Sequence, residues 1–303
     1  MPSSKLPYRK MRRISLSAYH SYVKGHDSVT VDNVRIPLVK EWNITELGPT
    51  DFKPEAWTVW SFEDRGDWAT HQGNFRGNWS PYVPRNLIDH YTKEGDTVCD
   101  PMMGSGTTLV ECKLMGRRAI GVDINKDAAM LALNRLDFKA SSEKPRIEIY
   151  VGDARRLDAI GNGTIGLVAT HPPYWRLIPY TKAKKGDLSA LKLRDFILQM
   201  GEVANECFRI LHANGHCAIL IGDTRRHQHY VPINVGVLGK FLEAGFVLKE
   251  DIIKLQHKTK TTREKWKAGR YDFYKIAHEH LYVFRKPSSQ EEANTFRYSR
   301  KWW

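Results

Sequence analysis

The chain has 303 residues, and its 41% hydrophobic content is sufficient for the core of one large α/β domain or two small ones. The formal net charge of +13 indicates a polyanionic partner, of which nucleic acid is the commonest; a generally basic surface is the alternative. No apolar run reaches the roughly 18–20 residues that span a bilayer. Residues 1–13 lack the apolar stretch of a secretory signal. These features exclude global disorder and predict a cytoplasmic protein without a membrane segment.

The four cysteines show no C-x-x-C spacing. They lie in apolar segments, so we interpret them as small core residues in a reducing compartment, not as disulfides or zinc ligands. They are Cys99, Cys112, Cys207 and Cys217.

The predicted secondary structure becomes regular only after residue 83. Residues 1–54 form a basic N-terminal extension without an assigned structure, and aromatic and charged residues crowd together over 57–77. Apolar spacing and terminating glycines predict helices over 84–91, 107–115, 126–136, 191–211 and 233–244. Strands are predicted over 97–100, 118–124, 146–151, 165–169, 217–221, 246–255 and 280–284.

The alternation of strands and helices predicts a doubly wound α/β domain, with a parallel sheet and helices on both of its faces. The last two strands have no apolar helical pattern between them, which suggests a terminal antiparallel hairpin. We assign the domain to residues 55–290, with a hairpin insert at about 254–277, and a polar, basic tail to residues 291–303.

A glycine-containing loop over 100–108 follows the first regular strand. Gly104 and Gly106 let the backbone approach a small ligand closely, because they have no Cβ. Asp100 can accept a hydrogen bond from a cationic amine. Asp123, at the end of the next strand, is spaced to bind ribose hydroxyls.

This loop could bind a dinucleotide, a nucleoside triphosphate as in a P-loop, or S-adenosylmethionine. A glycine turn without a ligand is the fourth interpretation. A dinucleotide fingerprint needs a small residue where Leu109 stands, and a P-loop needs a lysine after Gly106. S-Adenosylmethionine has no phosphate that Asp100 would repel, so it fits best.

A second motif, His-Pro-Pro-Tyr-Trp at 171–175, follows the strand over 165–169. The exocyclic amine of a base is a poor nucleophile because its lone pair is conjugated with the ring. The His171 side chain and the backbone carbonyl of Pro172 can each accept a hydrogen bond from one N–H group of this amine. The two prolines fix the direction of that carbonyl. An aromatic face can stack the base; a plain turn is the alternative. The predicted catalytic residues are His171, Pro172, Pro173 and Tyr174.

Together the two motifs resemble those of class I S-adenosylmethionine-dependent methyltransferases that modify exocyclic amines of DNA bases, at N4 of cytosine or N6 of adenine. The resemblance covers about residues 57–286 and departs from the Asp/Asn/Ser-Pro-Pro-Tyr signature at His171. It implies a Rossmann-like, seven-stranded, mostly parallel sheet with a terminal antiparallel hairpin. It also implies an extra cofactor-contacting motif before the cofactor loop, loosely matched by residues 77–82.

The resemblance also assigns a role to each residue around the cofactor. Asp153, at the end of the third strand, would contact the adenine amino group. The residues expected to bind S-adenosylmethionine are Trp79, Ser80, Asp100, Met102, Gly104, Ser105, Gly106, Thr107, Thr108, Asp123, Ile124, Asp153 and Ala154.

Cations interleaved with aromatic residues over 254–275 predict a DNA-binding surface, because phosphates need cations and splayed bases need flat faces. Lysines after the catalytic motif are expected to line the same groove. No long insertion is visible for a recognition domain, so we expect a short target site and a flipped base. The expected DNA contacts are Trp175, Lys182, Lys184, Lys185, Lys258, Lys260, Arg263, Lys265, Trp266 and Arg270.

Double-stranded DNA is therefore the expected substrate, with cytosine N4 preferred because His171, like Ser, is a neutral acceptor and Trp175 follows Tyr174. The alternatives are an RNA methyltransferase acting on guanine N2 or adenine N6, and a non-catalytic nucleic-acid-binding protein on this fold. A cognate restriction nuclease is a candidate partner, and the sequence does not set the oligomeric state. Cytosine C5 methylation needs a Pro-Cys pair and zinc deamination a P-C-x-x-C motif; both are absent, and no metal site is predicted.

Overall fold

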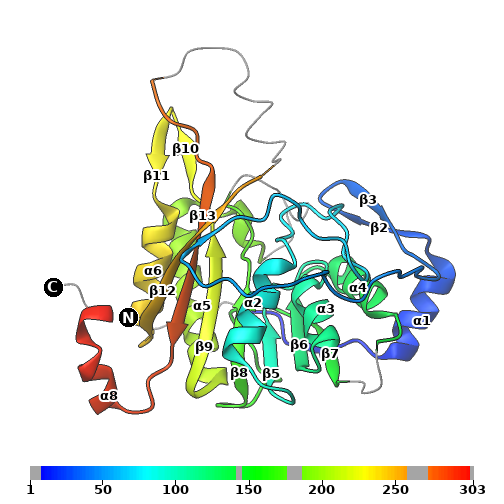
Figure 1. The fold of residues 1–303 in the computed structure, drawn as a ribbon, viewed down its shortest axis with the longest axis horizontal. Helices are drawn as coiled ribbons and strands as arrows, with labels where there is room; N and C mark the ends of the chain where they lie inside the picture. Colours follow the sequence, from blue (N-terminus) through cyan, green and yellow to red (C-terminus); the bar gives the residue numbers. More distant parts are fainter. Residues whose placement is uncertain (1–7, 141–144, 176–185, 258–271, 301–303) are drawn as a thin grey trace.

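A sheet with helices on both faces forms the body of this computed structural model, which describes residues 8–140, 145–175, 186–257 and 272–300 (Figure 1). Within these residues one nine-stranded sheet has the order β1-β7-β6-β5-β8-β9-β13-β12-β4. Its strands are β1 (Arg12–Arg13), β4 (Val59–Trp60), β5 (Thr97–Asp100), β6 (Arg118–Asp123), β7 (Ile147–Val151), β8 (Ile165–Thr170), β9 (Leu211–Ile221), β12 (Val247–Leu255) and β13 (His278–Arg285).

The seven strands from β7 to β12 have the predicted arrangement. The strands β7, β6, β5, β8 and β9 pair in parallel, and β13 runs antiparallel between β9 and β12. This confirms the Rossmann-like sheet with its terminal hairpin. Two short strands extend it, because β1 pairs with β7 at one edge and β4 pairs with β12 at the other. The sheet therefore has nine strands, and two-residue strands are too short to leave a periodic pattern in the sequence.

Two apolar clusters fill the space on either face of the sheet. Successive side chains of β8 divide between them, with Leu167 and Ala169 in the first cluster and Val168 in the second. The cysteines are buried and unpaired, as expected for core residues. The first cluster is covered by α1 (Leu16–Gly25), α2 (Tyr82–Tyr91), α3 (Thr107–Leu114) and α4 (Lys126–Leu136), and the second by α5 (Leu193–Ile210) and α6 (Ile233–Glu243).

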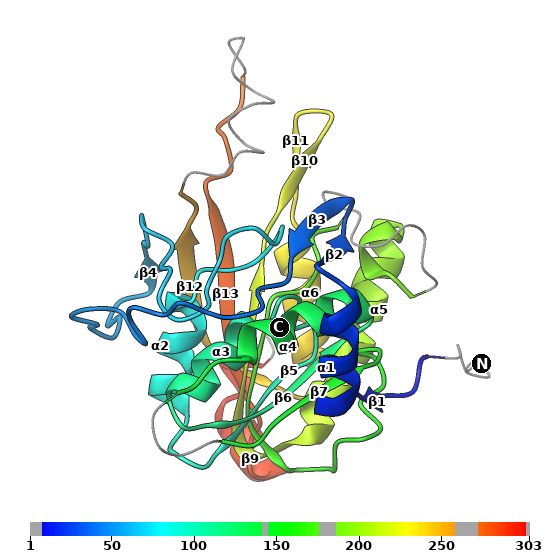
Figure 2. The same cartoon turned by 90° about the vertical axis from the view of Figure 1, so that its right-hand side faces the viewer.

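The N-terminal residues, which have no assigned structure at the sequence level, pack into the first cluster. The helix α1 and the hairpin of β2 (Ser28–Val31) and β3 (Val34–Pro37) lie beside α4 (Figure 2). Tyr19 is 1% exposed, and its hydroxyl donates to Asp137 at 3.1 Å. The backbone N–H of Val39 donates to Asn134 at 2.9 Å. The segment from Tyr19 to Leu38 thus contributes to the core of the domain.

Three further segments differ from the predicted elements. The strand β9 begins at Leu211, directly after α5, so Asn214 and Gly215 lie inside a strand and not in a loop. The hairpin of β10 (Thr224–Arg226) and β11 (His229–Val231) projects beyond the carboxyl end of β9 (Figures 1 and 2). After β13 follow α8 (Gln290–Thr295) and a 3-10 turn at Arg297–Ser299. Among the described residues, every helix is too short or too polar to span a bilayer.

Candidate active site

A cavity opens beyond the carboxyl ends of β5, β6 and β8, where parallel α/β sheets bind their ligands. Its volume, including solvent at the mouth, is about 880 Å³, within the range of roughly 300–1,000 Å³ that suits small ligands. Among the described residues that line it are four acids and neither lysine nor arginine. In a protein of net charge +13, this favours a cationic ligand over a phosphate-bearing one. The acids are Asp100, Asp123, Asp153 and Asp187.

Asp100 is held at the end of β5 by three hydrogen-bond donors. Its carboxylate accepts from the hydroxyls of Thr108 at 2.6 Å and Thr170 at 2.8 Å, and from the N–H of Met102 at 3.2 Å. Burial raises the pKa of Asp100 to about 6, although these donors lower it. Thr108 thus acts through Asp100 and does not line the cavity itself, whereas Met102 does.

Asp123 lies at the end of β6, where its side chain is half-buried against the cavity. It accepts hydrogen bonds from the N–H groups of Asn125 at 2.7 Å and Gly104 at 3.0 Å. Burial raises the pKa of Asp123 to about 7, and the two backbone donors lower it. Gly104 has φ +52°, and a Cβ there would lie 3.0 Å from the Phe75 ring. Only glycine fits this turn without strain.

The remaining residues of the cofactor loop, 105–107, each contact a different neighbour of the cavity. A Cβ on Gly106 would lie 2.9 Å from Cβ of Ala132, so this glycine lets α3 pack closely on α4. Ser105 lines the cavity, and its hydroxyl accepts from Arg135 at 2.6 Å. Thr107 donates to the side chain of Asn78, which lines the cavity. Gly106, Thr107 and Thr108 therefore shape the cavity from behind.

Asp153, which is expected to contact adenine, is already paired with Arg155. The guanidinium binds both carboxylate oxygens, at 2.8 Å and 2.6 Å, and both side chains are 6% exposed. Oδ1 also accepts from the backbone N–H of Arg155 at 3.0 Å, so Oδ2 is the oxygen that keeps a lone pair for an additional amino group. Ile124 and Ala154 line the cavity beside Asp153.

We expect the affinity for S-adenosylmethionine to rise with pH between about pH 5 and 8. The pKa of Asp100 is raised to about 6 and that of Asp123 to about 7, so a cationic ligand must displace protons from these two carboxyls. Because folding raises both pKa values, the stability they contribute without ligand is present at low pH and is lost as pH rises through 6–7. Titration calorimetry in buffers of different ionisation enthalpy would measure the released protons. The Asp123→Asn variant should lose the part of this rise in affinity that occurs near pH 7. An affinity independent of pH would contradict the assignment of Asp100 and Asp123 to the cofactor site.

The segment before α2 forms a wall of the cavity. Phe75, Asn78 and Trp79 line it, together with Val31 from β2. The sequence motif at 77–82 pointed to Trp79, but the other three were missed; the crowding of aromatic residues over 57–77 was the available signal. Ser80, the second candidate in this motif, does not line the cavity. Its hydroxyl donates to the carbonyl oxygen of Arg65 at 2.7 Å, which shapes the turn before α2.

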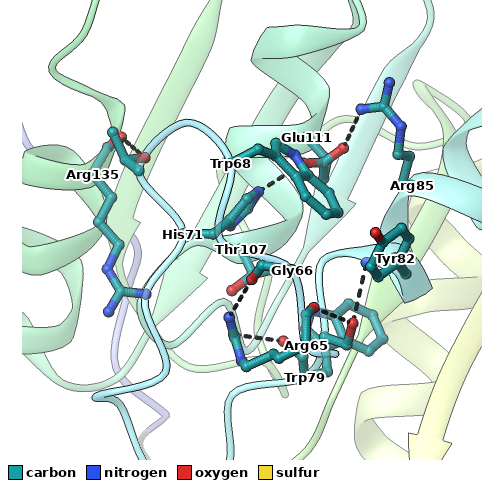
Figure 3. A network of polar contacts seen from close by, with 12 residues as sticks. Arg65, Gly66, Trp68, His71, Trp79, Tyr82, Arg85, Thr107, Glu111 and Arg135 are labelled. Atoms are coloured by element: carbon teal, nitrogen blue, oxygen red, sulfur yellow. Dashed lines mark hydrogen bonds and ion pairs between the residues drawn. The ribbon is translucent and has the colours of Figure 1, made fainter. Parts of the chain in front are cut away.

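A buried carboxylate on α3, Glu111, fastens this wall to the cofactor loop's own helix (Figure 3). It accepts hydrogen bonds from the Trp68 indole at 2.7 Å and from His71 Nε2 at 2.6 Å on one oxygen, and from Arg85 at 2.8 Å on the other. Glu111 is 0% exposed. Burial lowers the pKa of His71, although Glu111 raises it, which favours the neutral imidazole; Nε2 is the nitrogen that donates, because a carboxylate oxygen accepts. Glu111 and Thr107, which donates to Asn78, thus tie the segment that carries Phe75 and Trp79 to α3.

The catalytic motif places His171 in the cavity. Its side chain is 8% exposed, and neither ring nitrogen has a hydrogen-bond partner among the described residues. The ring stacks on Trp79 with centroids 5.8 Å apart and meets the Tyr174 ring edge-on at 5.1 Å. A buried polar atom without a partner costs about 1–3 kcal/mol, so a ligand group that pairs with His171 gains from it. Pro172 is buried beside it, and Pro173 lines the cavity.

Trp175 is expected to contact DNA, but its ring is buried in the structure. It is 8% exposed, and its indole N–H donates to the carbonyl oxygen of Leu191 at 2.9 Å. The guanidinium of Arg226 lies 5.2 Å from its ring centroid. Its ring packs in the second cluster. Trp175 therefore anchors the motif to the segment before α5 and offers no exposed face.

A buried glutamate on β13, which sequence reasoning missed, lies against the catalytic motif. Glu279 is 2% exposed, and its Oε1 accepts from the Tyr174 hydroxyl. The same oxygen is 3.6 Å from His171 Nε2, and Oε2 is 3.1 Å from Lys254 Nζ. Burial alone would raise the pKa of Glu279, but His171, Lys254 and Tyr174 outweigh it and hold that pKa below its usual range. The signal in the sequence was an acid between two histidines, directly before the apolar run of the last strand.

Most of the expected DNA contacts lie outside the described residues, so their placement stays a prediction. They are Lys182, Lys184, Lys185, Lys258, Lys260, Arg263, Lys265, Trp266 and Arg270. The described part of this region shows cation–aromatic contacts at the β10–β11 hairpin. The guanidinium of Arg225 lies 4.6 Å from the centroid of the Phe273 ring and donates to the carbonyl oxygen of Tyr274 at 2.7 Å. The hairpin is thereby tied to the chain that leads into β13.

The chain matches two families of methyltransferases. The profile of a DNA methylase family matches residues 6–134 and 165–301, and that of an RMKL-like methyltransferase domain matches residues 90–208. A solved S-adenosylmethionine-dependent methyltransferase from Methanosarcina mazei covers 67% of this chain and 98% of its own, with a TM-score of 0.48 and 14% identity.

Two curated relatives show local similarity. The type II methyltransferase M2.DpnII of Streptococcus pneumoniae is 46% identical over 56 residues, which are 18% of this chain and 21% of that protein. The tRNA (guanine(10)-N2)-dimethyltransferase of Pyrococcus abyssi is 32% identical over 95 residues, which are 31% of this chain and 28% of that protein. Both matches span less than a third of the relative. Because the first profile covers well over half of the chain, however, the protein belongs to the DNA methylase family, whose cofactor is S-adenosylmethionine.

Proposed function

We propose that this protein transfers a methyl group from S-adenosylmethionine to the exocyclic amine of a flipped base in double-stranded DNA, with cytosine N4 preferred over adenine N6. One observation carries the proposal: Asp100, Asp123 and His171 line a single acidic cavity. A cationic methyl donor and an amine held by His171 would meet there, so positioning could supply much of the rate enhancement.

Each residue of the cavity has a role in this proposal. Asp100 would accept from the ammonium group of the cofactor and Asp123 from its ribose hydroxyls, since carboxylates accept from both. The cofactor supplies the methyl group from its sulfonium centre. His171 and the carbonyl oxygen of Pro172 would accept from the target amine, while Tyr174 stacks the base.

DNA binding would rest on the net charge of +13 and on cations around the mouth of the cavity. We assign this surface to the β10–β11 hairpin, with Arg225 and Arg226, and to the cations expected at 182–185 and 258–270. The family membership supports DNA as the substrate. The proposal concerns the reaction and its substrate, and it assigns neither a cognate restriction nuclease nor an oligomeric state.

RNA is the second candidate substrate. The local similarity to a tRNA (guanine(10)-N2)-dimethyltransferase favours it. Guanine N2 is also an exocyclic amine, so the same cavity chemistry would apply. The two substrates differ in the surface that surrounds the flipped base, not in the groups that bind the cofactor.

Methyl transfer from labelled cofactor, followed by nucleoside mass spectrometry, tests the proposal. We expect label in DNA as N4-methylcytosine. Label in N6-methyladenine would change the base but keep the substrate class, and label in RNA alone would overturn it. The Asp123→Ala variant is the control for contaminating host enzymes, because it should bind the cofactor poorly while keeping its fold.

A further inference from the structure

The surroundings of His171 are unusual for a group that only accepts a hydrogen bond. A carboxylate, Glu279, reaches its ring from β13, with Oε1 3.6 Å from Nε2. This distance exceeds a normal hydrogen bond by a few tenths of an ångström. In ligand-free sites such catalytic contacts are often long and shorten when the substrate binds.

Glu279 is itself fixed from two sides. Tyr174, three residues after His171, donates its hydroxyl to Oε1, and Lys254 of β12 pairs with Oε2 at 3.1 Å. The side chains of Glu279 and Lys254 are 2% and 14% exposed. Tyr174 and Lys254 therefore orient the carboxylate toward the imidazole, and Glu279 lies on the β12–β13 hairpin.

We propose that Glu279 is a positioning residue for the methyl transfer proposed above, which directs the Nε2–H of His171 toward itself and leaves Nδ1 to take the proton that the methylated amine releases. The inference rests on the proposed function. It assigns His171 the work of a base, which the neutral acceptors Asn and Ser of related motifs cannot do to the same extent.

The proton and electron balance of this step is complete with the methyl donor already named. The amine nitrogen forms a bond to the methyl carbon, and the carbon–sulfur bond breaks with its electron pair staying on sulfur. The nitrogen is then cationic and carries one proton too many. His171 Nδ1 takes this proton, and the Glu279 carboxylate stabilises the imidazolium until the proton passes to solvent.

Other charged groups around His171 set the size of this effect. His171 lies close enough to Asp100 of β5 to lower the pKa of that carboxyl. Lys254 weakens the effect of Glu279, because it neutralises part of the Glu279 charge. The indole of Trp79 covers one face of the imidazole.

The test is an NMR titration of histidine-labelled, cofactor-free, full-length protein, in which the His171 signal is identified by its loss in His171→Ser. We expect Glu279→Gln to lower the pKa of His171 by about one unit, a tenfold loss of proton affinity. Lys254→Met should raise it, and this second variant keeps the test decisive if Glu279→Gln does not fold. Glu250→Gln on β12 removes a carboxylate elsewhere and should leave the His171 pKa unchanged.

Kinetics provide the second measurement. Glu279→Gln should lower kcat at least about tenfold with the KM for DNA and the cofactor Kd nearly unchanged, and should move the acidic limb of the pH profile to lower pH. A His171 pKa that does not respond to Glu279→Gln or Lys254→Met overturns the inference, as does an effect on KM alone. If these pKa shifts occur but wild-type protein methylates no DNA, the proposed function fails and the His171–Glu279 coupling stands.

Discussion

Replacing Glu111 with alanine is expected to lower the free energy of unfolding by about 3–5 kcal/mol. The change leaves the Arg85 guanidinium, the His71 imidazole and the Trp68 indole without their common acceptor, and the His71 and Trp68 side chains are buried. Urea denaturation of the cofactor-free protein would measure the loss. Glu111→Gln should lower the free energy of unfolding by less than Glu111→Ala does, because an amide oxygen can still accept a hydrogen bond from some of the three donors.

An exposed ion pair offers the matched control for this prediction. Lys240 and Glu243 pair on the surface of α6, where the Glu243 side chain is 66% exposed. Glu243→Ala should cost less than about 1 kcal/mol. If Glu111→Ala costs no more than Glu243→Ala, the buried network does not hold the cavity wall in place. Cofactor affinity should fall together with stability, since the wall carries Asn78 and Trp79.

Replacing His171 with alanine is expected to lower kcat by about 10²–10⁴-fold with cofactor affinity largely kept. The variant removes the proposed side-chain acceptor of the amine, while Asp100 and Asp123 remain in the cavity. His171→Ser should retain more activity than alanine because a hydroxyl still accepts a hydrogen bond. Methyl transfer under single-turnover conditions, together with calorimetric binding of the cofactor, separates the two effects.

Tyr174→Ala should also reduce turnover strongly, because stacking of a base on an aromatic ring is worth about 1–3 kcal/mol. It additionally removes the hydroxyl that binds Glu279. His20 is exposed on α1, so His20→Ala is the control and should leave turnover unchanged. Full activity in both His171→Ala and Tyr174→Ala would place the chemistry elsewhere.

The sequence was sufficient for the parts of the molecule in which local pattern decides the structure. The strand that ends at Asp100 and the helix from Lys126 have strong apolar periodicity, so their limits could be predicted closely. The acid at each strand end lies in the cavity because parallel strands align their carboxyl ends. The same argument predicts that His171, which follows β8, lies at the carboxyl ends of the strands.

The contacts that the sequence did not reveal join segments that are distant along the chain. Val31 reaches the cavity, and Glu279 reaches Tyr174, only because the sheet and its covering helices bring them together. Trp175 illustrates the converse case. An aromatic residue beside a predicted stacking residue looks like part of the same wall, yet the partner of its indole N–H, Leu191, turns it into the core.

The two edge strands have a consequence for the order in which the chain folds. Arg12 pairs with Val151 and Val59 with Ile253, although β1 and β4 lie within the same N-terminal stretch. During synthesis on the ribosome this stretch emerges long before either partner exists, and the entropy of closing such long loops slows the pairing. The outer edges of the sheet should thus be completed last. Until then β7 and β12 expose unpaired N–H and C=O groups, and nascent chains are most prone to pair with one another at this stage.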